Sequence, residues 1–162
     1  MIYSDRDLVY GLQHGLFSVS PVSEDDIQPA SIDLHLDKIL KKVTGEEIST
    51  PYELKPSEFI LGSTFENIRI GESVAGIVNG KSSLARLGLM VHVTAGYIDP
   101  GYYGNITLEF FNCSDKPILL KEDMKICQLI IENLTNPVVR PYGTTGLNSH
   151  YQGSKGVVNS RL

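Results

Sequence analysis

The stretch HVTAGYIDPGYYGNITLEFFN, residues 92–112, decides the fold of this chain. It contains a strand-like segment, a Pro-Gly turn, and then a second strand whose residues alternate between two faces. In the second strand, Ile106, Leu108 and Phe110 share one apolar face, whereas Glu109 lies on the other. A period of two residues indicates β structure rather than a helix.

The same pattern continues outward on both sides. From Ile27 onward, short segments rich in Val, Ile, Thr, Tyr and Phe are separated by Gly, Pro, Asn and Asp, which predicts a mainly β domain. The strand candidates are residues 32–36, 58–64, 73–78, 105–112 and 125–132. Ahead of them, Ser4 is placed to cap one short amphipathic helix that Gly15 ends.

Composition narrows the class of protein. A chain of 162 residues predicts a single compact domain over residues 1–162, and a net charge of -5 disfavours binding to nucleic acid through its phosphates. A polar start and the lack of a long apolar run predict a soluble, cytoplasmic protein with no membrane contact. Of the two cysteines, Cys127 lies in an apolar run, which favours a buried, reduced thiol over a disulfide.

The segment GKSSLARLG, residues 80–88, is a candidate phosphate-binding turn. Ser82 or Ser83 could cap one helical turn that Gly88 closes, and a helix start, two hydroxyls and a cation suit an anion. A Walker A loop is rejected because three residues, not four, separate Gly76 from Gly80. The plainer alternative is a capped turn whose charged side chains are simply solvated.

Two carboxylates are candidates for chemistry. Asp99 comes at a strand end before the Pro-Gly turn, where it either faces a pocket or only bonds its own backbone. Glu109 lies in an otherwise apolar strand, where it is either solvent-facing or held in a pocket to move protons. Zinc-type base deamination needs His-x-Glu and Cys-x-x-Cys, and the sequence has neither.

Four segments carry a resemblance to a known family. They are QPASIDL (residues 28–34), GKSSLARLG (80–88), HVTAGYIDPGYYGNITLEFFN (92–112) and YQGSKGVVNSR (151–161). In this order and at these positions they resemble the dCTP deaminase family of the dCTP deaminase and dUTPase superfamily. The resemblance implies a distorted β jelly roll with short helices, a homotrimer whose active sites form where neighbouring subunits meet, and dTTP as a feedback inhibitor.

The resemblance also implies roles for individual residues. Ser82 and Arg86 would line the base, Glu109 would activate water with help from the chain at 93–95, and Asp99 would hold the deoxyribose 3′-hydroxyl. The nucleotide-binding set comprises Lys81, Ser82, Ser83, Arg86, Val93, Ala95, Asp99, Thr107, Leu108, Glu109, Gln128, Tyr142, His150 and Ser154. Magnesium would be held through the triphosphate, without zinc, and the Gly/Ser-rich tail, residues 141–162, would order over the nucleotide.

The expected reaction is zinc-independent deamination of dCTP in dUMP and dTTP supply. The small Ala95-Gly96 site resembles members that go on to dUMP and pyrophosphate, whereas deaminase-only members commonly carry His at the second position. Alternatives are a deaminase that stops at dUTP, a dUTP pyrophosphatase, and a silent nucleotide-binding protein. Glu109 argues against a plain dUTPase, which lacks it. Lys81, His150 and Ser154 depart from the family's Arg, Lys and Gln, which predicts altered phosphate recognition.

Overall fold

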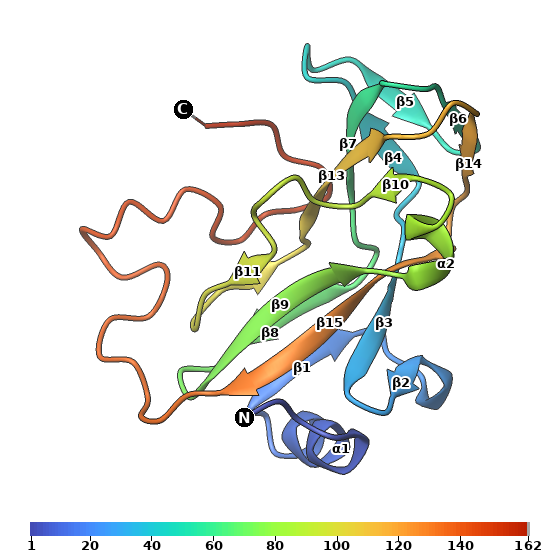
Figure 1. Ribbon diagram of the computed structural model, residues 1–162. Helices are drawn as coiled ribbons and strands as arrows, with labels where there is room; N and C mark the ends of the chain where they lie inside the picture. The colour runs from blue at the N-terminus through green and yellow to red at the C-terminus, as the bar shows by residue number, and fades with distance from the viewer. Residues whose placement is uncertain (162) are drawn as a thin grey trace.

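The computed structural model describes residues 1–161, and within them the chain is mainly β (Figure 1). The strands form two five-stranded sheets, one three-stranded sheet and one two-stranded sheet in this part of the chain, and all named pairs are antiparallel. Two α-helices, α1 (Asp5–Gln13) and α2 (Ser82–Ala85), and a 3-10 turn, η1 (Glu24–Asp26), accompany them. The predicted fold class is confirmed.

The first five-stranded sheet has β15 at its centre. Its order is β11 (Tyr97–Ile98), β9 (Val74–Gly80), β15 (Lys125–Asn133), β3 (Ser31–His35) and β2 (Ile27–Gln28). Gln128 of β15 lies opposite Asp33 on one side and Asn79 on the other. Residues opposite one another in a ladder project from the same face, so these three polar side chains form one row.

The second five-stranded sheet contains the alternating strand at the end of the 92–112 stretch. Its order is β10 (Leu89–Met90), β13 (Thr107–Asn112), β7 (Phe59–Ser63), β4 (Ile39–Lys41) and β5 (Glu47–Ser49). Along β13 the residues alternate between buried and partly exposed, as predicted. A Cβ at Gly62 would come within 2.4 Å of the Phe110 ring, so only glycine lets that ring lie against β7.

Two smaller sheets complete the strands. The three-stranded sheet consists of β1 (Phe17–Ser20), β8 (Asn67–Ile70) and β12 (Tyr103–Gly104), and the two-stranded sheet of β14 (Ile118–Leu120) and β6 (Tyr52–Leu54). Residues from all four sheets enter one buried cluster, among them Leu34, Phe110, Ile68 and Leu120. A single core therefore fixes the sheets relative to one another.

The two helices bear out one capping prediction and contradict the other. Ser4 caps α1 in a reciprocal capping box with Asp7, and Gly15 follows the helix at φ 69°. In α2 the N-cap residue is Lys81, and no side chain caps the turn. The prediction that a serine caps α2 is wrong because Ser82 and Ser83 lie inside its first turn, where their hydroxyls cannot reach the first free N–H groups.

Cys127 is fully buried and both cysteines are free, which confirms the prediction of a buried, reduced thiol. Burial raises the pKa of the Cys127 thiol. Among residues 1–161, no helix is long and apolar enough to cross a membrane.

Candidate active site

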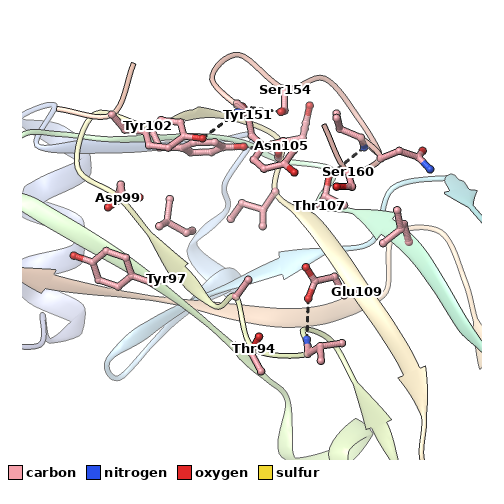
Figure 2. Close-up of a pocket in the computed structure, with 18 of the residues that line it drawn as sticks. Thr94, Tyr97, Asp99, Tyr102, Asn105, Thr107, Glu109, Tyr151, Ser154 and Ser160 are labelled. Carbon is pink, nitrogen blue, oxygen red and sulfur yellow. Dashed lines mark hydrogen bonds between the residues drawn. The ribbon is translucent and has the colours of Figure 1, made fainter. Parts of the chain in front are cut away.

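A pocket of about 730 Å³ opens between β11, β13 and the tail (Figure 2). Its polar lining includes both candidate carboxylates, Asp99 and Glu109, together with Thr107 and Asn105. The tail closes one side, because Tyr151, Ser154 and residues 158–160 also line the pocket. A volume of this size is in the range of small-molecule sites.

Glu109 faces into this pocket from β13, on the strand face opposite the core (Figure 2). Its Oε2 accepts a hydrogen bond of 2.9 Å from the backbone N–H of Val93. Within residues 1–161 this is the side chain's one hydrogen bond, so Oε1 is left for a ligand or a water. Of the two sequence alternatives for Glu109, the structure therefore supports the pocket carboxylate.

Asp99 lies at the end of β11, on the side of the pocket formed by the Pro-Gly turn (Figure 2). Its neighbours there are aromatic. Tyr102 is buried, its hydroxyl donates to the backbone oxygen of Asn105 at 2.7 Å, and burial raises its pKa to about 12. Tyr97 is exposed, and partial burial together with the negative charge of Asp99 raises its pKa. Both phenols stay neutral at physiological pH.

The tail is held by hydrogen bonds to residues 101–107 of the same chain. Gly156 N–H donates to the Asn105 side chain at 3.1 Å, and Val158 N–H donates to Thr107 Oγ1 at 3.1 Å. Gln152 anchors the preceding turn, since its amide donates to Gly101 O at 2.8 Å. These contacts hold residues 152–158 beside the pocket. The predicted tail begins at residue 141, and its last residue, 162, lies outside the described part.

The structure divides the predicted site residues into two groups. The residues that line the pocket are Val93, Ala95, Asp99, Thr107, Glu109, Tyr142 and Ser154. The predicted residues that do not line it are Lys81, Ser82, Ser83, Arg86, Gly96, Leu108, Gln128 and His150. Of the second group, Leu108 projects into the core instead, because it lies on the apolar face of β13.

Helix α2 presents an open polar surface away from the pocket. The side chains of Ser82, Ser83 and Arg86 are exposed, and none of them has a hydrogen-bond or ion-pair partner in the described part of the chain. Leu87, directly after them, is 57% exposed. In Figure 1, α2 lies at one edge of the molecule and the tail at the other. One subunit thus holds the predicted base-binding turn and the predicted carboxylates at separate places.

Gly96 is packed against the sheet. Its carbonyl accepts a hydrogen bond of 2.7 Å from Val78 N–H. A Cβ at this position would lie 2.8 Å from Val78 O and 3.0 Å from His92 Nε2. A side chain here must therefore displace the segment that presents Val93 and Ala95 to the pocket.

His92 lies beneath this segment, and His150 lies on the tail. His92 is partly buried, and its Nδ1 has no hydrogen-bond partner among the described residues. His150 is exposed, and its carbonyl oxygen accepts a hydrogen bond from the Arg161 side chain. The Arg161 guanidinium in turn lies 5.8 Å from the centre of the Tyr151 ring. The tail therefore holds the Arg161 guanidinium beside His150 and Tyr151.

Sequence reasoning did not single out every residue of the pocket. Among the polar and aromatic lining residues that it did not name individually are Tyr97, Tyr102, Asn105, Asn159 and Ser160. The aromatic residues flank Asp99 and the Pro-Gly turn, so their spacing from that turn was an available signal. The contribution of Asn159 and Ser160 depends on how the tail folds back, which no local pattern indicates.

Two solved structures resemble this chain in fold. The EIAV dUTPase superposes with a TM-score of 0.57 at 26% identity, over 80% of this chain and 96% of that one. The 2'-deoxycytidine 5'-triphosphate deaminase from Agrobacterium tumefaciens superposes with a TM-score of 0.71 at 19% identity, over 82% of this chain and 48% of that longer one. The fold is thus the one that dUTPases and dCTP deaminases share.

Sequence comparisons then identify the family within this fold. Residues 41–134 match the family model described as dCTP deaminase-like. A protein from Corynebacterium diphtheriae named "dCTP deaminase, dUMP-forming" is 39% identical, over 99% of this chain and 97% of its own length. The chain belongs to the dCTP deaminase-like family, as its motifs predicted.

Proposed function

We propose that this protein deaminates dCTP and converts the product to dUMP and pyrophosphate. The observation that carries the proposal is the Glu109 carboxylate, which lies in the pocket and is oriented by the Val93 N–H at 2.9 Å. The relative from Corynebacterium diphtheriae bears the name of this reaction. The product would serve dUMP and dTTP supply.

The first step needs only protein groups. Glu109 takes a proton from water, the hydroxide adds to C4 of cytosine, and the same carboxyl passes the proton to N3. Glu109 then moves the proton of the new C4 hydroxyl to the amino nitrogen, the C4–N bond breaks to release ammonia, and the C4 oxygen becomes the uracil carbonyl. The Val93 N–H fixes one carboxylate oxygen, so the other is aimed at the water. Arg86 and Ser82 would stabilise the tetrahedral species by charge and hydrogen bonding.

That step requires residues from two subunits. The pocket of one chain contains Glu109 and Asp99, whereas Ser82 and Arg86 lie on the exposed turn α2. In a homotrimer, α2 of one subunit would cover the pocket of its neighbour and place Arg86 over the base. The partnerless polar side chains and exposed Leu87 of α2 support this assembly, since a docked neighbour would bury them.

Lys81, Ser83 and Gln128 would hold the triphosphate, joined by Tyr142 and the tail. Their N–H and hydroxyl donors suit phosphate oxygens, and among the described residues no group of three or more His, Cys, Asp or Glu side chains could hold a metal ion. This donor set fits magnesium bound through the phosphates. The ion would neutralise phosphate charge. Inhibition by dTTP, with the same triphosphate, belongs to the same proposal.

Cleavage of the phosphates would follow at the other end of the pocket. A second water attacks the α-phosphorus of dUTP, pyrophosphate leaves, and dUMP remains. Asp99 would hold the 3′-hydroxyl and orient this water. Ala95 lines the pocket, and the tight packing of Gly96 against β9 keeps that wall close to the sheet. The small residues at 95 and 96 therefore support the dUMP-forming reaction over a deaminase that stops at dUTP.

Product analysis tests the proposal directly. Purified protein with dCTP and magnesium is followed by chromatography for dUTP, dUMP and pyrophosphate, with ammonia measured in parallel. Ammonia, dUMP and pyrophosphate should rise together without free dUTP. Accumulating dUTP would identify a deaminase only, dUMP from added dUTP without ammonia from dCTP a dUTP pyrophosphatase, and binding of dCTP without any product a silent nucleotide-binding protein.

A further inference from the structure

A buried ionic cluster links α2 to the first five-stranded sheet. Asp33 of β3 is 3% exposed, and its Oδ1 accepts a hydrogen bond from the ammonium group of Lys81. Its Oδ2 lies 3.5 Å from Lys125 Nζ. A carboxylate buried this deeply needs cationic partners, and Asp33 has one lysine on each oxygen.

The two lysines differ in how many acceptors surround their ammonium groups. Lys125 Nζ donates to Asp25 O at 2.8 Å and forms ion pairs with Asp26 Oδ1 at 3.0 Å and Asp33 Oδ2 at 3.5 Å, so its ammonium group is surrounded by acceptors of the fold. Lys81 has Asp33 as its one acceptor within residues 1–161. Two N–H groups of Lys81 therefore remain for a ligand, whereas Lys125 contributes its ammonium group to contacts within the fold.

Asp33 also lies where the triphosphate would bind. It is directly opposite Gln128 in the ladder between β3 and β15. Lys81 is the N-cap residue of α2, and its carbonyl accepts the N–H groups of Leu84 and Ala85 at 3.0 and 2.9 Å. A displaced Lys81 would therefore shift both its ammonium group and the start of α2.

We propose that Asp33 is a positioning residue for triphosphate recognition, which holds the Lys81 ammonium group beside Gln128 with two N–H groups free for phosphate oxygens. The inference rests on the proposed function, because it assigns Lys81 to the triphosphate. Asp33 acts through Lys81, because both of its carboxylate oxygens already have lysine partners. Its charge also keeps two neighbouring lysines from repelling each other, so the site is set before the ligand arrives.

The test compares Asp33→Asn with the parent enzyme. The amide keeps the shape of the side chain and loses its charge, so KM for dCTP should rise about tenfold, as expected for a weakened charge-assisted contact, while kcat stays within about twofold. Inhibition by inorganic tripolyphosphate should weaken by the same factor. Inhibition by deoxycytidine, which has no phosphate, should not change. A general structural defect would weaken both inhibitors.

A double-mutant cycle connects the effect to Lys81. If Asp33 acts through Lys81, adding Asp33→Asn to Lys81→Met should not raise KM further, whereas independent effects would multiply. The matched control is Asp26→Asn, which removes a contact of Lys125 and none of Lys81, and should leave KM for dCTP unchanged. Asp33→Glu, which keeps the charge, should give an intermediate KM and serves if Asp33→Asn does not fold.

Two outcomes overturn the inference: equal losses for tripolyphosphate and deoxycytidine, or multiplying effects in the cycle. Both are distinct from failure of the proposed function, which would appear as no ammonia from dCTP with the parent enzyme. In that case tripolyphosphate affinity, measured by calorimetry on the same variants, still decides whether Asp33 positions Lys81 for phosphates.

Discussion

Oε2 of Glu109 lies 2.9 Å from the backbone nitrogen of Val93, so β13 and the segment between β10 and β11 meet at the pocket. Position 109 is 16 residues beyond position 93 in the chain, and the Asp99 turn lies between them. The hydrogen bond thus closes the loop that presents Asp99. It ties the orientation of the carboxylate to the shape of that loop.

Glu109→Gln should abolish deamination while the pocket keeps its shape. The amide oxygen can still accept the Val93 N–H, but the side chain can no longer take a proton, and general-base groups contribute about 10²–10⁴-fold. Ammonia release from dCTP should fall by this factor with little change in dCTP affinity by calorimetry. A variant that still released ammonia at the parent rate would remove Glu109 from the mechanism.

Glu109→Gln and Arg86→Gln should complement each other in mixed trimers. Each variant alone lacks one essential group at every site. In every trimer that contains both variants, one of the three interfaces pairs an intact Glu109 with an intact Arg86. Co-expressed, differently tagged subunits purified through both tags should therefore regain a substantial fraction of activity. Mixed trimers as inactive as either parent variant would show that each site uses one chain.

Gly96→Ala should separate the two reactions. The new Cβ would come 2.8 Å from Val78 O, so the segment that carries Ala95 must move. We expect the ratio of dUMP to dUTP formed from dCTP to fall severalfold, with a smaller loss of ammonia release. The control is Gly15→Ala after α1, away from the pocket, where a Cβ meets no atom within 4 Å, although φ there is 69°. An unchanged product ratio would show that this contact plays no part in phosphate cleavage.

Stability should decrease between pH 10 and 12, partly because of Tyr102. Burial raises its folded-state pKa from the ordinary 10.0 to about 12. Its contribution is therefore complete below pH 10 and is lost as the pH rises through the folded-state value, because only the unfolded chain ionises readily there. In Tyr102→Phe the urea midpoint should depend less steeply on pH in this window. Tyr52, whose hydrogen bond to Glu58 raises its pKa to about 12, accounts for part of the slope that remains.

The two thiols should react at very different rates. Cys113 is exposed, whereas Cys127 is fully buried and its pKa is raised by burial. In the native protein an aromatic disulfide reagent should label Cys113 rapidly and Cys127 only after denaturation. In Cys113→Ser, no rapid phase should remain. Fast labelling of that variant would mean that the sheet around β15 opens readily.

Sequence reasoning reached the fold because its main signals are local. The alternation around Glu109 predicted both the strand and the direction of that side chain, and the capping residues predicted α1. Some of the residues that the motifs singled out, among them Asp99 and Glu109, line the pocket. Short pairing segments such as β10 and β12 were not predicted, because two residues carry too little periodicity to be recognised.

The arrangement of the site was not predictable from local patterns. Nothing in the sequence around Lys81 indicates that its side chain turns back to Asp33, because that pairing depends on β3 and β9 flanking β15. The path of the tail over Thr107 is equally a long-range result. The resemblance implied sites between subunits, and the separation of Arg86 from the pocket gives that expectation a physical basis.

The position of β15 between β9 and β3 has a consequence for synthesis of the protein. Both flanking strands leave the ribosome well before β15, and until it arrives each has an unpaired edge rich in apolar residues. Such edges attract other nascent chains. Any chain released before residue 125 lacks the strand that joins the two halves of this sheet. Slower translation of residues 81–124 should therefore increase aggregation during expression, whereas chaperones that shield open strands should reduce it.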